Sequence, residues 1–177
     1  SVFFLFFIGI IETLNIIYFF MISQIYTYFS IEMIYLWLNI GVLPFWFILV
    51  FFPYSRVCKI FTISIFPLII FSLVYGFLIY KIFLSSYNFL NNFNLYLSFE
   101  NLQSLFEEKY FLILFWIHFL AINLFCGGWI VNDYQKFNIP KVLIFLPLII
   151  TYFIGPIGIL IYWFIRIFYS KKITLYD

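Results

Sequence analysis

Five apolar segments occupy most of this chain, and their lengths constrain its fold more than any other feature. Each is close to or longer than the roughly 20 residues that a helix needs to cross the hydrocarbon core of a bilayer. A helix satisfies its own backbone hydrogen bonds in lipid, so no segment requires a partner strand. The segments are Val2–Phe29, Ile31–Phe52, Ile60–Leu84, Tyr110–Val131 and Val142–Phe168.

The composition supports a membrane location. The chain is 67% hydrophobic and only 9% charged, whereas a soluble domain averages about a quarter charged residues. It has too few polar groups to cover a surface in water, so lipid must be the solvent for most of it. We therefore predict an all-α, polytopic membrane helical bundle. Residues 31–177 should form four core transmembrane helices, and residues 1–30 an extra N-terminal hydrophobic helix.

Several classes of site are disfavoured by the residues present. The basic residues are scattered near the ends of the apolar segments, so no nucleic-acid surface is expected. Cys58 and Cys126 form no Cys-x-x-Cys motif. His118 is the only histidine, and one histidine does not make a metal site. We expect no metal, no cofactor and no catalytic constellation of a known motif.

Prolines predict where the spans bend. Pro44, Pro67, Pro147 and Pro156 all fall inside apolar segments. Each removes one backbone hydrogen bond and should kink its helix, unless a neighbour satisfies the freed carbonyl. The strongest expected break is the Gly-Pro pair that begins at Gly155.

One connection, residues 85–109, is long and polar. It opens with an asparagine-rich run at 88–94 and then predicts a short amphipathic helix with Ser98 as its N-cap. Leu102, Leu105 and Phe106 share one face of that helix. Polar residues, among them Glu100, share the other. This pattern is typical of a helix that lies on the bilayer surface, although an ordinary connector has the same pattern.

Polar residues within the spans are expected to contact protein. A carboxylate in mid-bilayer is costly, so Glu12 should meet a partner in another subunit or another span. His118 is either a functional proton donor or a packing residue that bonds a neighbouring helix, and packing is the more common role. We expect His118 and Asn123 to face neighbouring helices and not lipid.

The end of the fourth segment predicts a hairpin turn. Gly127 and Gly128 would let another backbone come close. Asn132 and Asp133 make a polar turn, in which Asp133 would pair with Lys136.

The distribution of basic residues does not predict the orientation of the chain in the membrane. With four consecutive spans, the two sides carry four and five basic residues, so the positive-inside rule does not decide between them. One side has Arg56, Lys59, Lys136 and Lys141, and the other has Lys81, Lys109, Arg166, Lys171 and Lys172.

Four motifs resemble a known family. They are Leu-Pro-Phe at residues 43–45, Trp-Ile-His-x-Leu-x-x-x-Leu-Phe at residues 116–125, Asn-Asp at residues 132–133, and Gly-Pro at residues 155–156. Together they are similar to the abscisic-acid-deficient-four-like family, which includes the plastid protein required for neoxanthin synthesis. The resemblance covers about residues 36–166 and implies a four-helix membrane protein. It leaves the N-terminal segment as an addition.

One position departs from that family. The family pattern carries Asp where this chain has Asn123, and an amide keeps hydrogen-bonding capacity but does not ionise. Heavy use of Phe, Tyr, Ile and Asn also indicates an AT-rich organellar or protist genome.

Two functions are therefore expected. The first is a non-catalytic accessory or scaffold subunit of a large organellar membrane complex, such as a respiratory complex or ATP synthase of the mitochondrial inner membrane. Its partners would be other membrane subunits and bilayer lipids, and the N-terminal helix would dock it. The alternative, implied by the resemblance, is a membrane isomerase-type enzyme that acts on a carotenoid or other isoprenoid, with a plastid membrane as its location.

Overall fold

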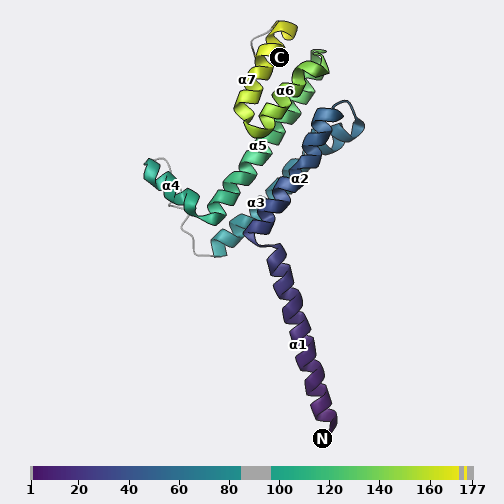
Figure 1. The fold of residues 1–177 in the computed structure, drawn as a ribbon, viewed down its shortest axis with the longest axis vertical. Helices are drawn as coiled ribbons and strands as arrows, with labels where there is room; N and C mark the ends of the chain where they lie inside the picture. The colour runs from purple at the N-terminus through teal and green to yellow at the C-terminus, as the bar shows by residue number, and fades with distance from the viewer. Residues whose placement is uncertain (1, 85–96, 172–173, 175–177) are drawn as a thin grey trace. The chain divides into compact units, whose positions relative to one another are not determined.

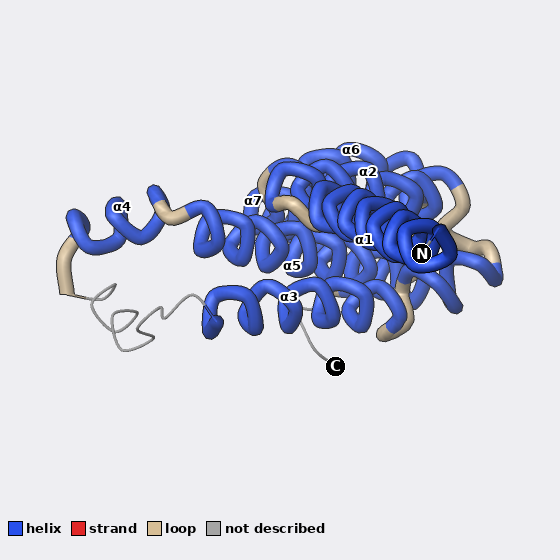
Figure 2. Tube along the Cα trace, turned by 90° about the horizontal axis from the view of Figure 1, so that it is seen from below, coloured by secondary structure: helices blue, strands red, loops and turns tan. Residues whose placement is uncertain are grey.

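The structure is a computed structural model that describes residues 2–84, 97–171 and 174. Every described element is a helix or a connecting loop, and no strand occurs among these residues (Figure 2). The expectation of an all-α protein is therefore confirmed. The chain divides into two compact units, residues 1–38 and 39–177.

The first unit contains α1, Val2–Tyr28, and the beginning of α2, Ile31–Phe51. A two-residue turn separates the helices although it contains neither Gly nor Pro. Ser30 explains the break, because its hydroxyl accepts a hydrogen bond from the backbone N–H of Met33 at 3.3 Å, as a helix N-cap does. Glu12 lies on α1 and is exposed within this unit.

Three described helical stretches are long and apolar enough to cross a membrane. They mark the chain as an integral membrane protein. The first is α2, which continues through Pro44 without interruption. The second covers Cys58–Ile82, and the third is α5, Lys109–Lys136.

The second of these stretches is not one regular helix. It begins with the π-helical turn η1, Cys58–Thr62, and continues as α3, Phe66–Leu84. Pro67 therefore occupies the first turn of α3, where a missing N–H costs little, and it does not kink the middle of a helix. The Ser64 hydroxyl accepts from the N–H of Phe66 at 3.2 Å and marks this start.

The predicted amphipathic helix is confirmed as α4, Phe99–Glu107. The Ser98 hydroxyl caps it by accepting from the N–H of Asn101 at 3.2 Å. Leu105 is buried, and the Phe106 ring packs against aromatic rings at the beginning of α5. The asparagine-rich run at 88–94 lies outside the described residues.

The fifth apolar segment differs from the expected single span. It forms two helices, α6, Lys141–Phe153, and α7, Gly155–Ser170, that pack against each other and against α5 (Figure 1). At 1.5 Å per residue they are about 20 and 24 Å long, shorter than the roughly 30 Å hydrocarbon core. The described chain therefore contains three candidate spans and a helical hairpin, and not four core spans.

The hairpin turns back because of the residues at its tip. Ile154 has extended backbone angles, φ −144° and ψ 81°, and so ends α6. Pro156 then falls in the first turn of α7, a position that suits its fixed φ. A Cβ at Gly158 would overlap Thr151, so only a glycine lets the two helices come this close.

Candidate functional site

The second unit contains two candidate sites: a buried polar cluster between α5 and α7, and a groove between α3 and α5. The cluster is centred on Asp133, in the last turns of α5. Its Oδ2 accepts hydrogen bonds from Arg166 Nε at 2.6 Å and from the Tyr162 hydroxyl at 2.7 Å. Both donors are fully buried, and Asp133 is 9% exposed.

Helical spacing explains how α7 presents both donors. Tyr162 and Arg166 are four residues apart, so they project from the same face of the helix. The rings of Tyr162 and Trp129 of α5 also meet edge to face, with their centroids 5.7 Å apart. The expected polar turn at Asn132 and Asp133, with Asp133 paired to Lys136, is therefore wrong, because both residues lie within α5, which continues to Lys136. The hairpin brings Arg166 back to Asp133, whereas Lys136 is exposed.

The cluster holds the end of the chain as well. Arg166 Nη1 donates to the carbonyl oxygen of Thr174 at 2.7 Å. Its guanidinium carbon lies 4.7 Å from the centre of the Phe137 ring. A buried charge is tolerated only when it is paired and hydrogen-bonded, and Arg166 meets both conditions. We interpret this cluster as the set of contacts that fixes α7 to α5.

Asn123 holds the tip of the hairpin. It is 2% exposed, and its Nδ2 donates to the carbonyl oxygen of Tyr152 at 3.3 Å. A Cβ at Gly155 would overlap the Asn123 side chain, so glycine is required there for this approach. Asn123 therefore contacts a neighbouring helix, and its role in this structure is to position the hairpin.

Gly127 allows α5 to pack closely against α2. A Cβ at Gly127 would lie 2.7 Å from the ring of Trp46, which is buried. The Trp46 ring also meets Tyr152 of α6 edge to face, with the ring centroids 5.4 Å apart. Gly127 thus lets a large aromatic residue join α2, α5 and α6. At Gly128 the nearest atom to an added Cβ is the Cα of Ile63, at 3.9 Å.

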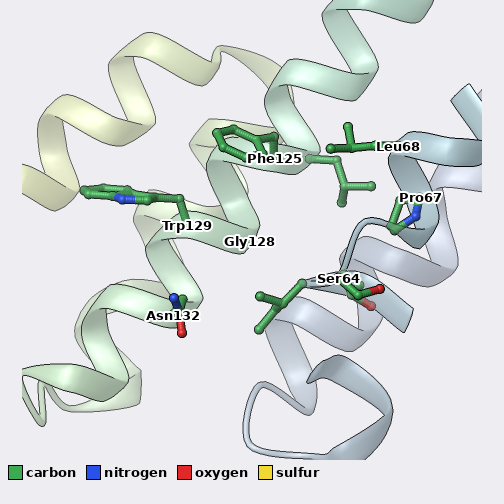
Figure 3. A pocket seen from close by; sticks show the side chains of 10 residues that line it. Ser64, Pro67, Leu68, Phe125, Gly128, Trp129 and Asn132 are labelled. Carbon is green, nitrogen blue, oxygen red and sulfur yellow. The ribbon is translucent and has the colours of Figure 1, made fainter. Parts of the chain in front are cut away.

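The groove between α3 and α5 begins beside the π-helical turn. Here a cavity of about 160 Å³ has Phe125, Gly128, Trp129 and Asn132 on α5 along one side (Figure 3). The other side is formed by the start of α3 and the residues just before it. Its lining is mostly apolar, and the polar groups lie toward the end that contains Asn132 and Ser64. The remaining lining residues are Thr62, Ile63, Pro67, Leu68 and Leu124.

A second pocket continues the groove toward the middle of α5. It has a volume of about 280 Å³ and is lined by His118 from α5 and by Tyr75 and Ser72 from α3. Leu68 lines both pockets, so they adjoin along the same seam. His118 is exposed and borders this groove, so the expectation that it packs against a neighbouring helix is not confirmed.

The two pockets follow α5 from His118 to Asn132. His118 and Asn132 are 14 positions apart on α5, which corresponds to about 21 Å of helix. The imidazole of His118 can both donate and accept a proton, and the hydroxyl of Tyr75 lines the same pocket. Among the described residues, no group of three or more His, Cys, Asp or Glu side chains could hold a metal ion.

Sequence reasoning missed two members of the polar cluster. Tyr162 and Arg166 give no local signal beyond their i, i+4 spacing, because the partner that they bind lies about 30 residues earlier. Tyr75 was missed for a similar reason, since tyrosines are abundant here and nothing in the sequence distinguishes it.

Comparisons with known proteins give one result. Residues 33–162, most of the chain, match the model of the ABA DEFICIENT 4-like family. This match confirms the resemblance that the four motifs indicate. In the comparisons with curated proteins and with solved structures, nothing matches the chain. Helix α1 lies outside the matched residues.

Proposed function

The chain belongs to the ABA DEFICIENT 4-like family, and we propose that it is a membrane enzyme of the isomerase type that acts on a carotenoid or a related isoprenoid. The observation that carries the proposal is the groove between α3 and α5. It is long, mostly apolar and bordered by the only histidine of the chain. An isoprenoid is a long apolar molecule that would enter such a groove from the bilayer.

The departure at Asn123 does not weaken this proposal. Asn123 lines neither pocket of the groove, and its amide is engaged at the hairpin tip. Replacement of the family's Asp by Asn therefore changes a contact between helices and leaves the ionisable lining of the groove as it is. The expectation of a non-catalytic accessory subunit rested only in part on that substitution, together with the lack of a catalytic motif and the AT-rich composition.

His118 is the residue that we assign to proton transfer. An isomerisation that moves a double bond or opens a ring needs a proton removed at one carbon or oxygen and delivered to another. A single imidazole does both, since it accepts at one nitrogen and donates from the other. Tyr75 and Ser72, on the facing helix, supply hydroxyls that would orient a polar group of the substrate.

A ligand-retention experiment tests the proposal. The protein, expressed in carotenoid-producing cells, is purified in mild detergent, and bound pigments are extracted and quantified. We expect a stoichiometric isoprenoid in the wild type and loss of it in Leu68→Trp, which fills the junction of the two pockets. Val142→Ala, at a position that is 83% exposed on α6, is the matched control. No pigment in the wild type, or full retention in Leu68→Trp, would overturn the groove as a ligand site.

Catalysis is tested separately from binding. His118→Gln should retain the ligand but abolish its conversion, measured by the ratio of substrate to product in the extract. Equal conversion by this variant would remove His118 from the mechanism while leaving the binding proposal intact.

We propose as a second function that the chain is an accessory subunit of a larger organellar membrane assembly, docked by α1. The observation that favours it is that α1 is an addition to the family region and carries the carboxylate of Glu12 on an otherwise uncharged helix. A carboxylate in lipid needs a partner. The proposed location is the mitochondrial inner membrane for this function, or a plastid membrane for the enzyme.

A further inference from the structure

Three separate segments of the second unit meet at one end of the bundle. The connection after α2 contacts the end of α5: Gln135 Nε2 donates a hydrogen bond to the carbonyl oxygen of Pro53 at 2.8 Å. Lys141 Nζ donates to the carbonyl of Phe51 at 2.7 Å. These bonds satisfy carbonyl groups at the C-terminal end of α2. The bond between Arg166 and Asp133 adds the end of α7 to the same region.

This end of the bundle carries a cluster of exposed cations. The five members are Arg56, Lys59, Lys136, Lys141 and Lys171, which we call the cationic end. Asp133 is the only acidic residue described there, and it is buried and paired with Arg166. Cations therefore outnumber acids among the described residues at this end.

The opposite end of the same unit has a different charge. It contains the end of α3, helix α4 and the beginning of α5, which meet where Phe106 packs on Phe111. Three exposed carboxylates lie there, on Glu100, Glu107 and Glu108, together with two lysines. The unit is therefore polarised along the direction of its spans.

The hairpin produces this polarity. If the fifth apolar segment crossed the membrane once, Arg166 and Lys171 would lie on the side opposite Lys136, and the basic residues would be nearly balanced. Because α6 and α7 turn back at Ile154, they lie on the same side.

We infer that the cationic end lies against the anionic phospholipid headgroups of the leaflet that faces the compartment from which the protein is inserted. Basic residues close to span ends stay on that side during insertion. Anionic lipids in that leaflet attract juxtamembrane lysine and arginine side chains. Their aliphatic stems cover apolar surface while the charges reach the headgroups. The inference does not depend on which function the groove serves.

Cysteine labelling tests the orientation. In a background without native thiols (Cys58→Ala with Cys126→Ala), single cysteines are placed at Tyr54, Thr174 or Leu97, and spheroplasts of a bacterial host are treated with a membrane-impermeant maleimide. We expect Leu97→Cys to react in intact spheroplasts. Tyr54→Cys and Thr174→Cys should react only after the membrane is permeabilised.

Two results would overturn the inference. Reaction of Tyr54→Cys and Thr174→Cys from opposite sides would mean that the last segment crosses the membrane. Reaction of both from outside would mean that the cationic end is translocated. If the thiol-free background does not fold, fusions of green fluorescent protein and of alkaline phosphatase after residue 177 of the unaltered chain report the side on which α7 ends, and an active phosphatase fusion would overturn the inference. The fluorescent fusion should be active and the phosphatase fusion inactive.

Lipid binding is measured with the purified protein. Arg56→Gln/Lys59→Gln/Lys136→Gln removes three charges, and Lys109→Gln, at the opposite end, is the matched control. Each protein is equilibrated in phosphatidylcholine micelles that contain phosphatidylglycerol, and the phosphatidylglycerol that co-purifies is quantified. Each lost charge should weaken this retention about fivefold. Equal retention of phosphatidylglycerol by the triple variant and the wild type would contradict the headgroup contact. So would a loss of retention in Lys109→Gln as large as that in the triple variant.

Discussion

Asn123 donates a hydrogen bond to the carbonyl oxygen of Tyr152, and that carbonyl lies four residues before Pro156. In a continuous helix the N–H of residue 156 would bond this oxygen, but proline has none. The Asn123 side chain, on α5, thus bonds the Tyr152 carbonyl oxygen, which the Gly-Pro break leaves without its helical partner. The contact joins the tip of the hairpin to the middle of the third candidate span.

Removal of the Asn123 amide should loosen the hairpin. Asn123→Ala leaves the partly buried carbonyl of Tyr152 without its donor, which costs about 1–3 kcal/mol. We expect a lower midpoint in thermal unfolding of the detergent-solubilised protein. Asn132→Ala, at an exposed position on the same helix, is the control and should unfold like the wild type. An unchanged midpoint for Asn123→Ala would mean that the hydrogen bond does not stabilise the fold.

Glycine substitutions should separate positions that pack from positions that do not. Gly155→Ala and Gly127→Ala introduce a Cβ into the space of Asn123 and Trp46, and we expect each to cost about 1–3 kcal/mol. At Gly76 no atom lies within 4 Å of an added Cβ. Gly76→Ala should therefore stabilise α3 by up to about 1 kcal/mol in thermal unfolding. Three equal effects would contradict the close approach of helices at Gly127 and Gly155.

The buried pair of Asp133 and Arg166 should behave as a unit. Arg166→Met leaves the Asp133 carboxylate buried without its cation, and a loss of about 3–5 kcal/mol is expected. The double variant Asp133→Leu/Arg166→Met removes both charges and should recover a large part of that loss. Denaturation of all four proteins gives the coupling energy of the cycle. If the two single losses simply add, the residues are not coupled in the way that their 2.6 Å contact indicates.

Truncation tests the proposed role of α1. A chain that begins at residue 30 retains all of the residues matched by the family model. It should still insert, but it should no longer co-migrate with a large assembly on a native gel. Glu12→Leu in the full chain is the point-variant counterpart and should weaken the same co-migration. Co-migration of the truncated protein with the assembly would show that α1 is not the docking element.

The local features were predictable because their causes are local. Ser98 caps α4, and Leu105 turns inward, as a short amphipathic pattern predicts. The Gly-Pro pair predicts a break near Ile154 because proline always lacks its N–H. The sequence could also be assigned to its family, because the motif around His118 combines rare residue types in a fixed order.

The sequence by itself determined the solvent of the protein, the helical class of its fold and the family. The lipid environment, the helical class and the family all depend on residue types and their spacing, which can be read directly from the sequence. Only the tertiary structure decided the path of the chain after the Gly-Pro break. A break permits either a kinked crossing or a return to the same side. The choice depends on contacts between distant residues, Asn123 with Tyr152 and Asp133 with Arg166. That return turns a nearly even distribution of basic residues into a cationic end, because it places Arg166 and Lys171 at the same end of the unit as Lys136.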